Sequence, residues 1–544
     1  MSLVEPSRER PAGAERLLII GWDGADWEIL DDLIERGHLP NVADMQLHGA
    51  HGALRSTIPS HSWAAWSTFL TGVNCGMHGV YDFAERRPGE LRSEIPVSSD
   101  SIRATTFLER LSEAGHDVRA ANIPVTFPPI PVKGRMISGV AIPAGARFVH
   151  PPEWADDLER RAPFPLNGME WSRFENDPEA LVDEAKRFVD LRTGSFEVLL
   201  EGDWSVAVCV YVAPDRLQHP FGAHLLPSHP RHADVSETPL AASIREVYGL
   251  LDSHIGRLRA AAGPGATTVL MSDHGFRPID RVANLTEVLC AIGFAARAPG
   301  SGRRARVSRA ASRARVVARK LPVLERLLEG DIGNAIRRRV GPHQELDWSK
   351  TVAYQSVRGG GVSINLEGRE PNGIVPPDGF YRVREELRDA LLAYEDPSTG
   401  SRPIEAVLRG GELYSGPYAE LGPDLLVQPE PLWAFTYTEA PSGTSRWPTG
   451  AHRRLGVLLS TGGRTVPGDL GERDIADVAA TALAFCGVAS PTIDGRPIAE
   501  IAGNTGHLGL ATETGVQTSR TPADLSEEDQ QQIAEHLRNL GYIE

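Results

Sequence analysis

The sequence has few cysteines and no long apolar run. Its four cysteines, Cys75, Cys209, Cys290 and Cys486, are scattered among 544 residues without a Cys-x-x-Cys pair. This pattern indicates a reducing compartment rather than a disulfide scaffold. No stretch of about 18 apolar residues occurs, so we expect no membrane-spanning helix. Residues 1–16 are polar and lack an apolar segment of signal-peptide length, and we therefore expect a cytoplasmic protein.

The sequence also lacks an overall excess of basic residues. Its formal net charge is −16 at pH 7, which disfavours broad binding to nucleic acids or anionic membranes. Arginine is nevertheless concentrated in residues 303–339, within a segment that has a helical pattern of apolar residues. We interpret residues 291–346 as an inserted helical, basic cap. The charges there form either a solvated helix face or a surface that attracts an anionic substrate.

Short apolar runs alternate with amphipathic helical patterns along the chain. Residues 205–212 form the clearest strand pattern, and residues 178–199 and 239–262 form long helical patterns. Uniformly apolar strands separated by helices are typical of a parallel sheet buried on both faces. We therefore predict an α/β fold with a doubly wound, mostly parallel sheet and helices on both faces.

We predict a catalytic domain over residues 15–290 and 347–502, with the insertion between them. The main sheet is expected to resume after Asp347, and residues 151–176 are expected to be irregular. Residues 503–544 are predicted to form a polar tail with a short C-terminal helix.

Acidic residues and histidines follow the predicted strands. Asp23 follows the apolar run Leu17 to Ile20, and two similar strands are followed by Asp215 with His219 and by Asp273 with His274. In open α/β sheets, ligands bind outside the carboxyl ends of the strands. We therefore expect these side chains to converge, although Asp23 taken alone could equally cap the helix that begins near Trp27.

Two further residues complete a candidate metal site. Ser62 precedes a helix predicted from Trp63 to Gly72, where it could be an N-cap or present its hydroxyl to a phosphate at the helix N-terminus. His452 lies in a predicted loop before a strand. The full set offers three carboxylates, three imidazoles and one hydroxyl, the donors that two adjacent divalent metals require: Asp23, Ser62, Asp215, His219, Asp273, His274 and His452.

At these motifs the chain resembles the alkaline phosphatase superfamily, in its type I phosphodiesterase and nucleotide pyrophosphatase branch. The resemblance runs from about Leu17 to Ile501 and rests on Gly21-Trp22-Asp23-Gly24, Ser62 to Gly72 with His78-Gly79-Val80, Pro214-Asp215 with His219, Ser272-Asp273-His274-Gly275, and Gly450-Ala451-His452. It implies an alkaline-phosphatase-like fold. It also implies one metal ion held by Asp215, His219 and His452, and a second held by Asp23, Ser62, Asp273 and His274.

The resemblance also implies a nucleophile. In the family a Thr or Ser stands ten residues before the Gly of a Thr-Gly pair, and counting back from Gly72 reaches Ser62. Thr57 and Ser60 are the alternatives. The implied reaction is hydrolysis of a phosphate ester through a metal-bound Ser62 and a phosphoseryl intermediate. Two divalent ions are implied, with Zn²⁺ expected first and Mn²⁺ or Fe²⁺ as alternatives.

We therefore expect a phosphodiesterase or nucleotide pyrophosphatase that acts on a small phosphate ester and has no membrane or nucleic-acid partner. A phosphomonoesterase or phosphonate hydrolase at the same site is the first alternative. A catalytically silent binding homologue is the second. The Asn that holds phosphate in several relatives has no clear counterpart, and the sulfatase branch is disfavoured because no Cys- or Ser-x-Pro-x-Arg sequence follows Asp23.

Overall fold

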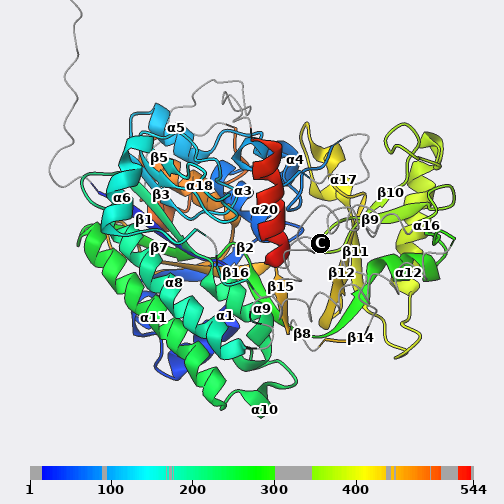
Figure 1. Ribbon diagram of the computed structural model, residues 1–544, viewed down its shortest axis with the longest axis horizontal. Coiled ribbons are helices and arrows are strands. Elements are labelled where there is room, and N and C mark those ends of the chain that lie inside the picture. The colour runs from blue at the N-terminus through cyan, green and yellow to red at the C-terminus, as the bar shows by residue number, and fades with distance from the viewer. Residues whose placement is uncertain are drawn as a thin grey trace, which may run out of the picture.

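A nine-stranded sheet forms the centre of the larger lobe of the protein (Figure 1). The computed structural model describes residues 15–87, 95–166, 168–170, 174, 177–299, 346–436, 443–445, 449–489, 492–503 and 525–540. In spatial order the strands are β17 (Gly468–Asp474), β2 (Ala50–Arg55), β16 (Leu455–Thr461), β7 (Thr267–Met271), β1 (Leu17–Trp22), β6 (Val206–Tyr211), β3 (Val118–Ala121), β4 (Gly134–Ile137) and β5 (Val149–His150). Only β16 and β5 run against the others, so the predicted mostly parallel sheet is confirmed.

Helices cover both faces of this sheet, as predicted. Because successive side chains of a strand point to opposite faces, the apolar run of β1 supplies two cores. Leu17 and Ile19 pack with α3 (Ser62–Thr71), α5 (Phe107–Glu113) and α18 (Ile475–Phe485). Leu18 and Ile20 pack with α1 (Trp27–Glu35), α2 (Pro40–His48), α8 (Pro178–Leu199) and α11 (Pro239–Ala262). The alternation of strands and helices along the sequence therefore produces a doubly wound α/β fold.

The smaller lobe corrects the expectation that the main sheet resumes after Asp347. The strands that follow form a separate antiparallel sheet in the order β11 (Ile404–Arg409), β12 (Leu425–Pro429), β10 (Gly361–Ile364) and β9 (Ala353–Val357), packed on α12 (Leu285–Ala291) and α16 (Phe380–Ala393). The turn between β9 and β10 is short, and Gly359 and Gly360 have positive φ. A tight turn of this kind pairs consecutive strands with each other, so the chain returns to the main sheet only at β16.

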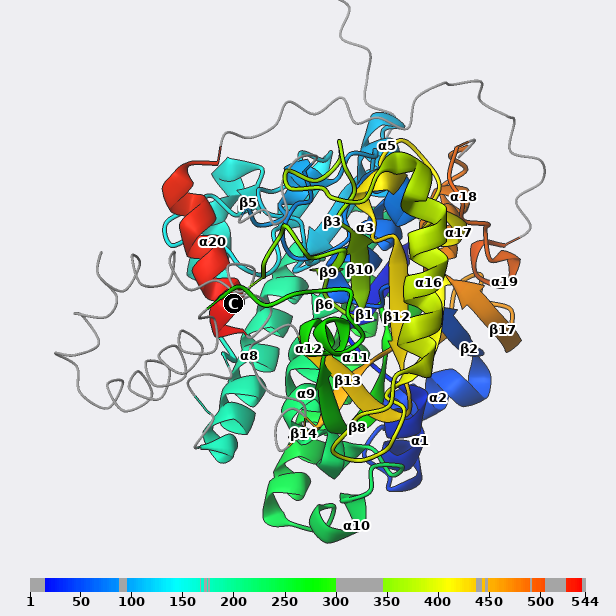
Figure 2. The same ribbon diagram turned by 90° about the vertical axis from the view of Figure 1, so that its right-hand side faces the viewer.

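A third sheet links the two lobes (Figure 1), and Figure 2 shows its strands from the side of the smaller lobe. Its long strand β8 (Gly275–Asn284) begins directly after Asp273 and His274, and pairs with β13 (Leu432–Thr436), β14 (Gly443–Thr444) and β15 (Gly450–Arg453). His452 was expected in a loop, but it lies in β15. Four residues are too few for an alternating pattern to reveal a strand, and only pairing with β8 defines it.

The other described helical segments range from single turns to helices of 13 residues. They are α4 (Cys75–His78), α6 (Ala155–Arg161), α9 (Ala213–Leu225), α10 (His232–Val235), α17 (Gly410–Leu413), α19 (Ala499–Ala502), α20 (Glu527–Asn539), and 3₁₀ turns at Ser99–Ser101, Pro152–Trp154, Pro377–Gly379 and Ala419–Leu421. Residues 151–176 were expected to be irregular, but α6 forms there because Trp154 and Leu158 are buried in the core beside α8.

The predicted C-terminal helix corresponds to α20, which packs on the larger lobe through Ile533, Leu537 and Leu540. Residues 300–345 of the predicted insertion and 504–524 of the predicted tail lie outside the described residues. The domain division and the basic cap therefore stay predictions.

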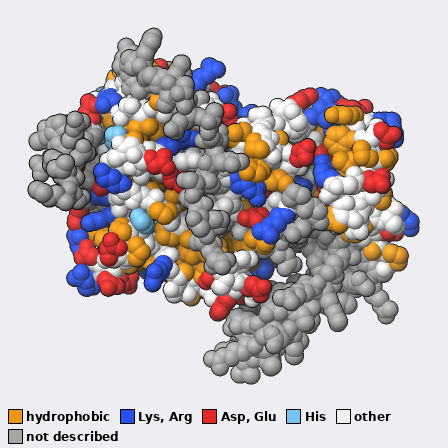
Figure 3. Space-filling model, turned by 90° about the horizontal axis from the view of Figure 1, so that it is seen from above, with side chains coloured by type: hydrophobic (Ala, Val, Ile, Leu, Met, Phe, Trp, Pro, Cys, Tyr) orange, Lys and Arg blue, Asp and Glu red, His pale blue; other side chains and the backbone are white. Residues whose placement is uncertain are grey.

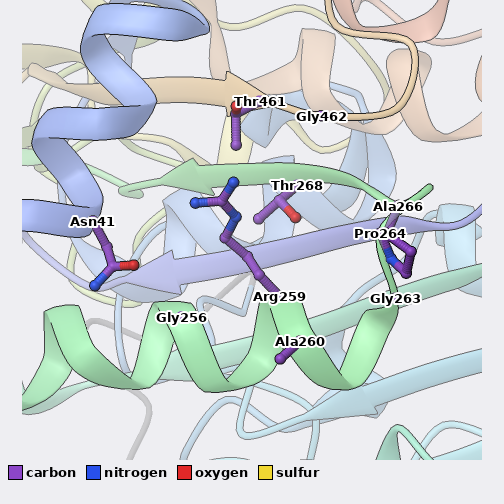
Figure 4. A pocket seen from close by; sticks show the side chains of 10 residues that line it. All are labelled: Asn41, Gly256, Arg259, Ala260, Gly263, Pro264, Ala266, Thr268, Thr461 and Gly462. Carbon is purple, nitrogen blue, oxygen red and sulfur yellow. The ribbon is translucent and has the colours of Figure 1, made fainter.

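Two surface features bear on where a ligand could bind. Acidic and basic side chains are interspersed on the face shown in Figure 3. A cavity of about 380 Å³ lies between α11 and the sheet and is lined by Asn41, Arg259, Thr268 and Thr461 (Figure 4). Thr268 is the second residue of β7 and Thr461 ends the antiparallel β16, so this cavity is at the opposite edge of the sheet from Asp23. Among the described part of the chain, no helix is long and apolar enough to cross a bilayer.

Asp26, rather than Asp23, caps helix α1. The Asp26 carboxylate accepts a hydrogen bond from Glu28 N at 2.9 Å and another from Phe276 N at 2.8 Å. It also accepts from Nε and Nη2 of Arg453, both at 2.5 Å. One fully buried carboxylate therefore joins the start of α1 to β8 and β15, and Asp23 does not serve as the cap.

We expect Asp26→Ala to lower the free energy of unfolding by about 2–4 kcal/mol, because it removes a helix cap and leaves Arg453 without its carboxylate. Asp32→Ala is the matched control in the same helix, since Asp32 pairs with Arg36 near the surface. Its loss should stay below about 1 kcal/mol. Urea denaturation of both variants measures the difference, and equal losses would contradict the linking role of Asp26.

Candidate functional site

Five of the seven predicted site residues follow the carboxyl ends of three adjacent strands. Asp23 follows β1, and Asp215 and His219 lie in α9, which follows β6. Asp273 and His274 separate β7 from β8. Because β6, β1 and β7 are parallel neighbours, these loops meet at one edge of the sheet.

His452 arrives from the opposite direction. In the pairing of β15 with β8, His452 stands opposite Phe276, two residues after His274. The imidazole of His452 stacks on that of His274, with 3.7 Å between the ring centroids. The structure thus brings all of the predicted side chains together, although they are spread over more than 400 residues of sequence.

The first group of potential ligands contains Asp215, His219 and His452. Asp215 Oδ1 lies 3.3 Å from His219 Nε2 and 3.2 Å from His452 Nε2, and the two Nε2 atoms are 3.0 Å apart. The other ring nitrogen of each histidine, Nδ1, lies beside a backbone carbonyl oxygen. His219 Nδ1 is 3.2 Å from the oxygen of Gly450, and His452 Nδ1 is 2.9 Å from that of Ser60. Since a carbonyl accepts the Nδ1 proton, each Nε2 keeps a lone pair directed at a common point.

The second group contains Asp23, Asp273 and His274, with Ser62 beside them. Ser62 Oγ lies 3.4 Å from Asp23 Oδ1 and 3.3 Å from His274 Nε2. His274 Nε2 is 3.4 Å from Asp273 Oδ2. One oxygen of each carboxylate accepts a hydrogen bond from the protein. Trp66 Nε1 donates to Asp23 Oδ2, and Gly24 N donates to Asp273 Oδ1, each at 3.0 Å.

The electrostatics of the second group favour a cation. Burial raises the pKa of Asp23 well above its usual range, and the nearby charges of Asp273 and Asp215 raise it further. Burial raises the pKa of Asp273 to about 8. Burial also lowers the pKa values of His274 and His452, which keeps these imidazoles neutral. Buried carboxylates beside neutral imidazoles are the environment that a divalent cation stabilises.

The donor chemistry agrees with this electrostatic reasoning. In each group, one potential ligand atom from every carboxylate and imidazole lies within 4.8 Å of the others. Asp273 Oδ2 is buried and has no hydrogen-bond donor among the described residues. A buried carboxylate oxygen in this state normally has an ion or water as its partner. The residues therefore fit two divalent ions with mixed nitrogen and oxygen ligands.

Ser62 differs from the sequence expectation in its place on the helix. His61 is the N-cap of α3, and Ser62 is the first helical residue, with its hydroxyl directed at Asp23. The alternatives are placed differently. Thr57 Oγ1 donates to the carbonyl of Pro59 at 2.7 Å, and Ser60 contacts His452 through its backbone carbonyl. The Ser62 hydroxyl is therefore the candidate nucleophile that contacts a carboxylate and an imidazole of the site.

Sequence reasoning missed the residues that support the site. Trp66 holds Asp23, and its position four residues after Ser62 on α3 was a usable signal because such residues share a helix face. Asp26 and Arg453 hold the strand that carries His452. Phe276 in β8 packs against His219 in α9 at 4.8 Å between ring centroids, and only the packing of α9 on β8 reveals this contact.

Comparisons with known proteins agree with this geometry. The family model described as type I phosphodiesterase / nucleotide pyrophosphatase matches residues 17–453. Phosphonoacetate hydrolase from Sinorhizobium meliloti 1021 in complex with phosphonoacetate is 15% identical, with a TM-score of 0.55 over 89% of this chain and 98% of that chain. Its complex with phosphonoformate is 14% identical, with a TM-score of 0.50 over 85% and 93% of the two chains.

Murine ectonucleotide pyrophosphatase / phosphodiesterase 5 is 13% identical, with a TM-score of 0.48 over 88% of this chain and 97% of that chain. A comparison with curated proteins gives no significant match. At these identities, the likeness to phosphonoacetate hydrolase shows a shared fold.

If both groups bind divalent ions, the metal-stripped protein should take up two ions per chain and become more stable. A free ion concentration 100-fold above the dissociation constant should raise the free energy of unfolding by about 2.7 kcal/mol per site. Metal analysis and thermal unfolding with added Zn²⁺ or Mn²⁺ measure both effects.

Asp215→Asn should lower the binding of one of the two ions. Asp252→Asn is the matched control, because Asp252 is a buried carboxylate that instead binds the backbone N–H groups of Asn41 and Val42. Equal metal uptake by wild type and Asp215→Asn would contradict the assignment of the first group.

Proposed function

Because the chain belongs to the type I phosphodiesterase / nucleotide pyrophosphatase family, and is therefore a phosphoester hydrolase, we propose that it cleaves phosphate diesters with Ser62 as the nucleophile. One observation carries this proposal. The Ser62 hydroxyl lies at the N-terminus of α3 and contacts both Asp23 and His274, beside the two groups of potential metal ligands.

In this proposal Asp215, His219 and His452 hold one divalent ion, and Asp23, Ser62, Asp273 and His274 hold the other. Zn²⁺ is the first candidate because it accepts imidazole and carboxylate ligands, and Mn²⁺ is the alternative. When bound, the two ions would supply positive charge to the phosphate oxygens and would lower the pKa of a coordinated hydroxyl.

Residues of the chain supply the nucleophile, bind the phosphate and position the potential ligands. The Ser62 oxygen attacks phosphorus in line, the bond from phosphorus to the leaving oxygen breaks, and a phosphoseryl group forms. Water then displaces Ser62 and releases the phosphate product. The first turn of α3 supplies backbone N–H groups and the positive end of the helix dipole to the phosphate. Trp66 and Gly24 hold Asp23 and Asp273 in place throughout.

Replacement of the nucleophile should abolish turnover without loss of metal. We expect Ser62→Ala to lower kcat by about 1,000-fold or more, because no other hydroxyl takes its position. Ser60→Ala and Thr57→Ala are the matched controls and should keep most of the activity. Steady-state kinetics and metal analysis of the three variants measure the effects. Normal turnover by Ser62→Ala would transfer the role to Ser60 or Thr57.

The class of substrate is tested with three compounds. Metal-stripped enzyme re-supplied with Zn²⁺ or Mn²⁺ should hydrolyse bis-p-nitrophenyl phosphate faster than p-nitrophenyl phosphate. A preference for the monoester would favour the phosphomonoesterase alternative. Faster hydrolysis of phosphonoacetate would favour a phosphonate hydrolase, as the phosphonoacetate hydrolase from Sinorhizobium meliloti 1021 is named. Full activity of the stripped enzyme would contradict metal dependence.

A further inference from the structure

Gln218 is a buried residue beside the site to which the mechanism gives no role. It lies in α9, three residues after Asp215 and directly before His219. Residues three apart share a helix face, so Gln218 lies on the same face of α9 as Asp215. Its exposed fraction is 0%.

The amide of Gln218 is unpartnered. Neither Oε1 nor Nε2 has a hydrogen-bond partner among the described residues. Leaving a buried polar group unpaired destabilises the folded state, and most buried side-chain amides in folded proteins are paired. A leucine or methionine would fill the same space without this cost. The glutamine amide therefore favours a partner other than the described side chains, and a water molecule suits a buried amide.

The position of Gly24 shows where this partner would lie. A Cβ atom added at Gly24 would be 3.3 Å from Gln218 Nε2 and 3.4 Å from the Cα of Asp215. The N–H of Gly24 donates to Asp273 Oδ1, and Asp273 Oδ2 is a buried atom without a hydrogen-bond donor among the described residues. An unpartnered donor and an unpartnered acceptor therefore both lie near Gly24.

We propose that Gln218 is a positioning residue of the metal centre, whose amide holds an ordered water molecule that also binds Asp273 Oδ2. The inference rests on the metal-dependent function proposed above. The water fits the site chemically, because the amide both donates and accepts, and a buried water needs two to four polar partners. Through this water, Gln218 in α9 fixes the carboxylate of Asp273, which follows β7, and so connects the two groups of ligands.

The test compares two buried glutamines in the full-length protein. Gln218→Met removes the amide and keeps the side-chain length. Gln355→Met is the matched control, because Gln355 in β9 is 3% exposed, has an unpartnered Nε2 and belongs to neither group of ligands. Removal of a group that orients a metal ligand typically lowers metal affinity by about 10- to 100-fold. We expect this loss for one ion in Gln218→Met and unchanged affinity in Gln355→Met, measured by competition with a chromophoric chelator.

A conservative variant separates the amide from its packing. Gln218→Asn keeps the amide and leaves space for another water, so its metal affinity should lie closer to wild type than that of Gln218→Met. Equal losses in the two variants would assign the effect to packing and overturn the proposal. If the amide were merely a buried defect, Gln218→Met would stabilise the metal-stripped protein and leave the metal affinity unchanged, which would also overturn it.

Metal binding by wild type and by Gln218→Met separates failure of the proposed function from failure of this inference. A wild-type chain that binds no divalent ion would overturn both the metal-dependent function and this inference. If wild type binds two ions and Gln218→Met binds them equally well, only the inference fails. Should Gln218→Met not fold, a crystal structure of the metal-loaded wild type decides the question. Density for a water within hydrogen-bond distance of Gln218 Nε2 and Asp273 Oδ2 is expected, and its absence would refute the proposal.

Discussion

Three carboxylates buried at one edge of the main sheet are the constraint on which the rest of the site depends. Asp23, Asp215 and Asp273 follow β1, β6 and β7. Because these strands pair in parallel, their carboxyl ends bring the three carboxylates close together. Burial and mutual repulsion raise the pKa of Asp23, as they would for any acid held in this position. The surrounding imidazoles, backbone N–H groups and Trp66 are arranged around these charges, and two cations would offset them.

The geometry of the site is completed by residues from distant parts of the sequence. His452 reaches Asp215 because β15 pairs with β8, and the ion pair between Arg453 and Asp26 holds that strand against the start of α1. The same pairing starts the path into the smaller lobe, since β8 also pairs with β13 and β14. The closure of the candidate site and the attachment of the second lobe therefore share one structural element.

Helix α3 shows how the exact start of a helix determines what a side chain near its N-terminus contacts. Ser62 was expected near the N-terminus of α3, either as a cap or with its hydroxyl toward a ligand. His61 occupies the cap position, so the Ser62 hydroxyl makes no capping hydrogen bond and instead contacts Asp23 and His274. The helix begins one residue earlier than Trp63. Its start depends on the path of the loop from Thr57 to Ser60, and no local sequence pattern specifies that path.

The sequence by itself determined the doubly wound fold and the family, because apolar strands, helical periodicity and the acids after the strands are local patterns. It also determined which residues could form the site. Only the tertiary structure decided that the strands after Asp347 form their own sheet, that β15 carries His452 to the other ligands, and that Gln218 is buried without a partner. These features depend on pairing and packing between segments hundreds of residues apart, which leave no periodic signal in the sequence.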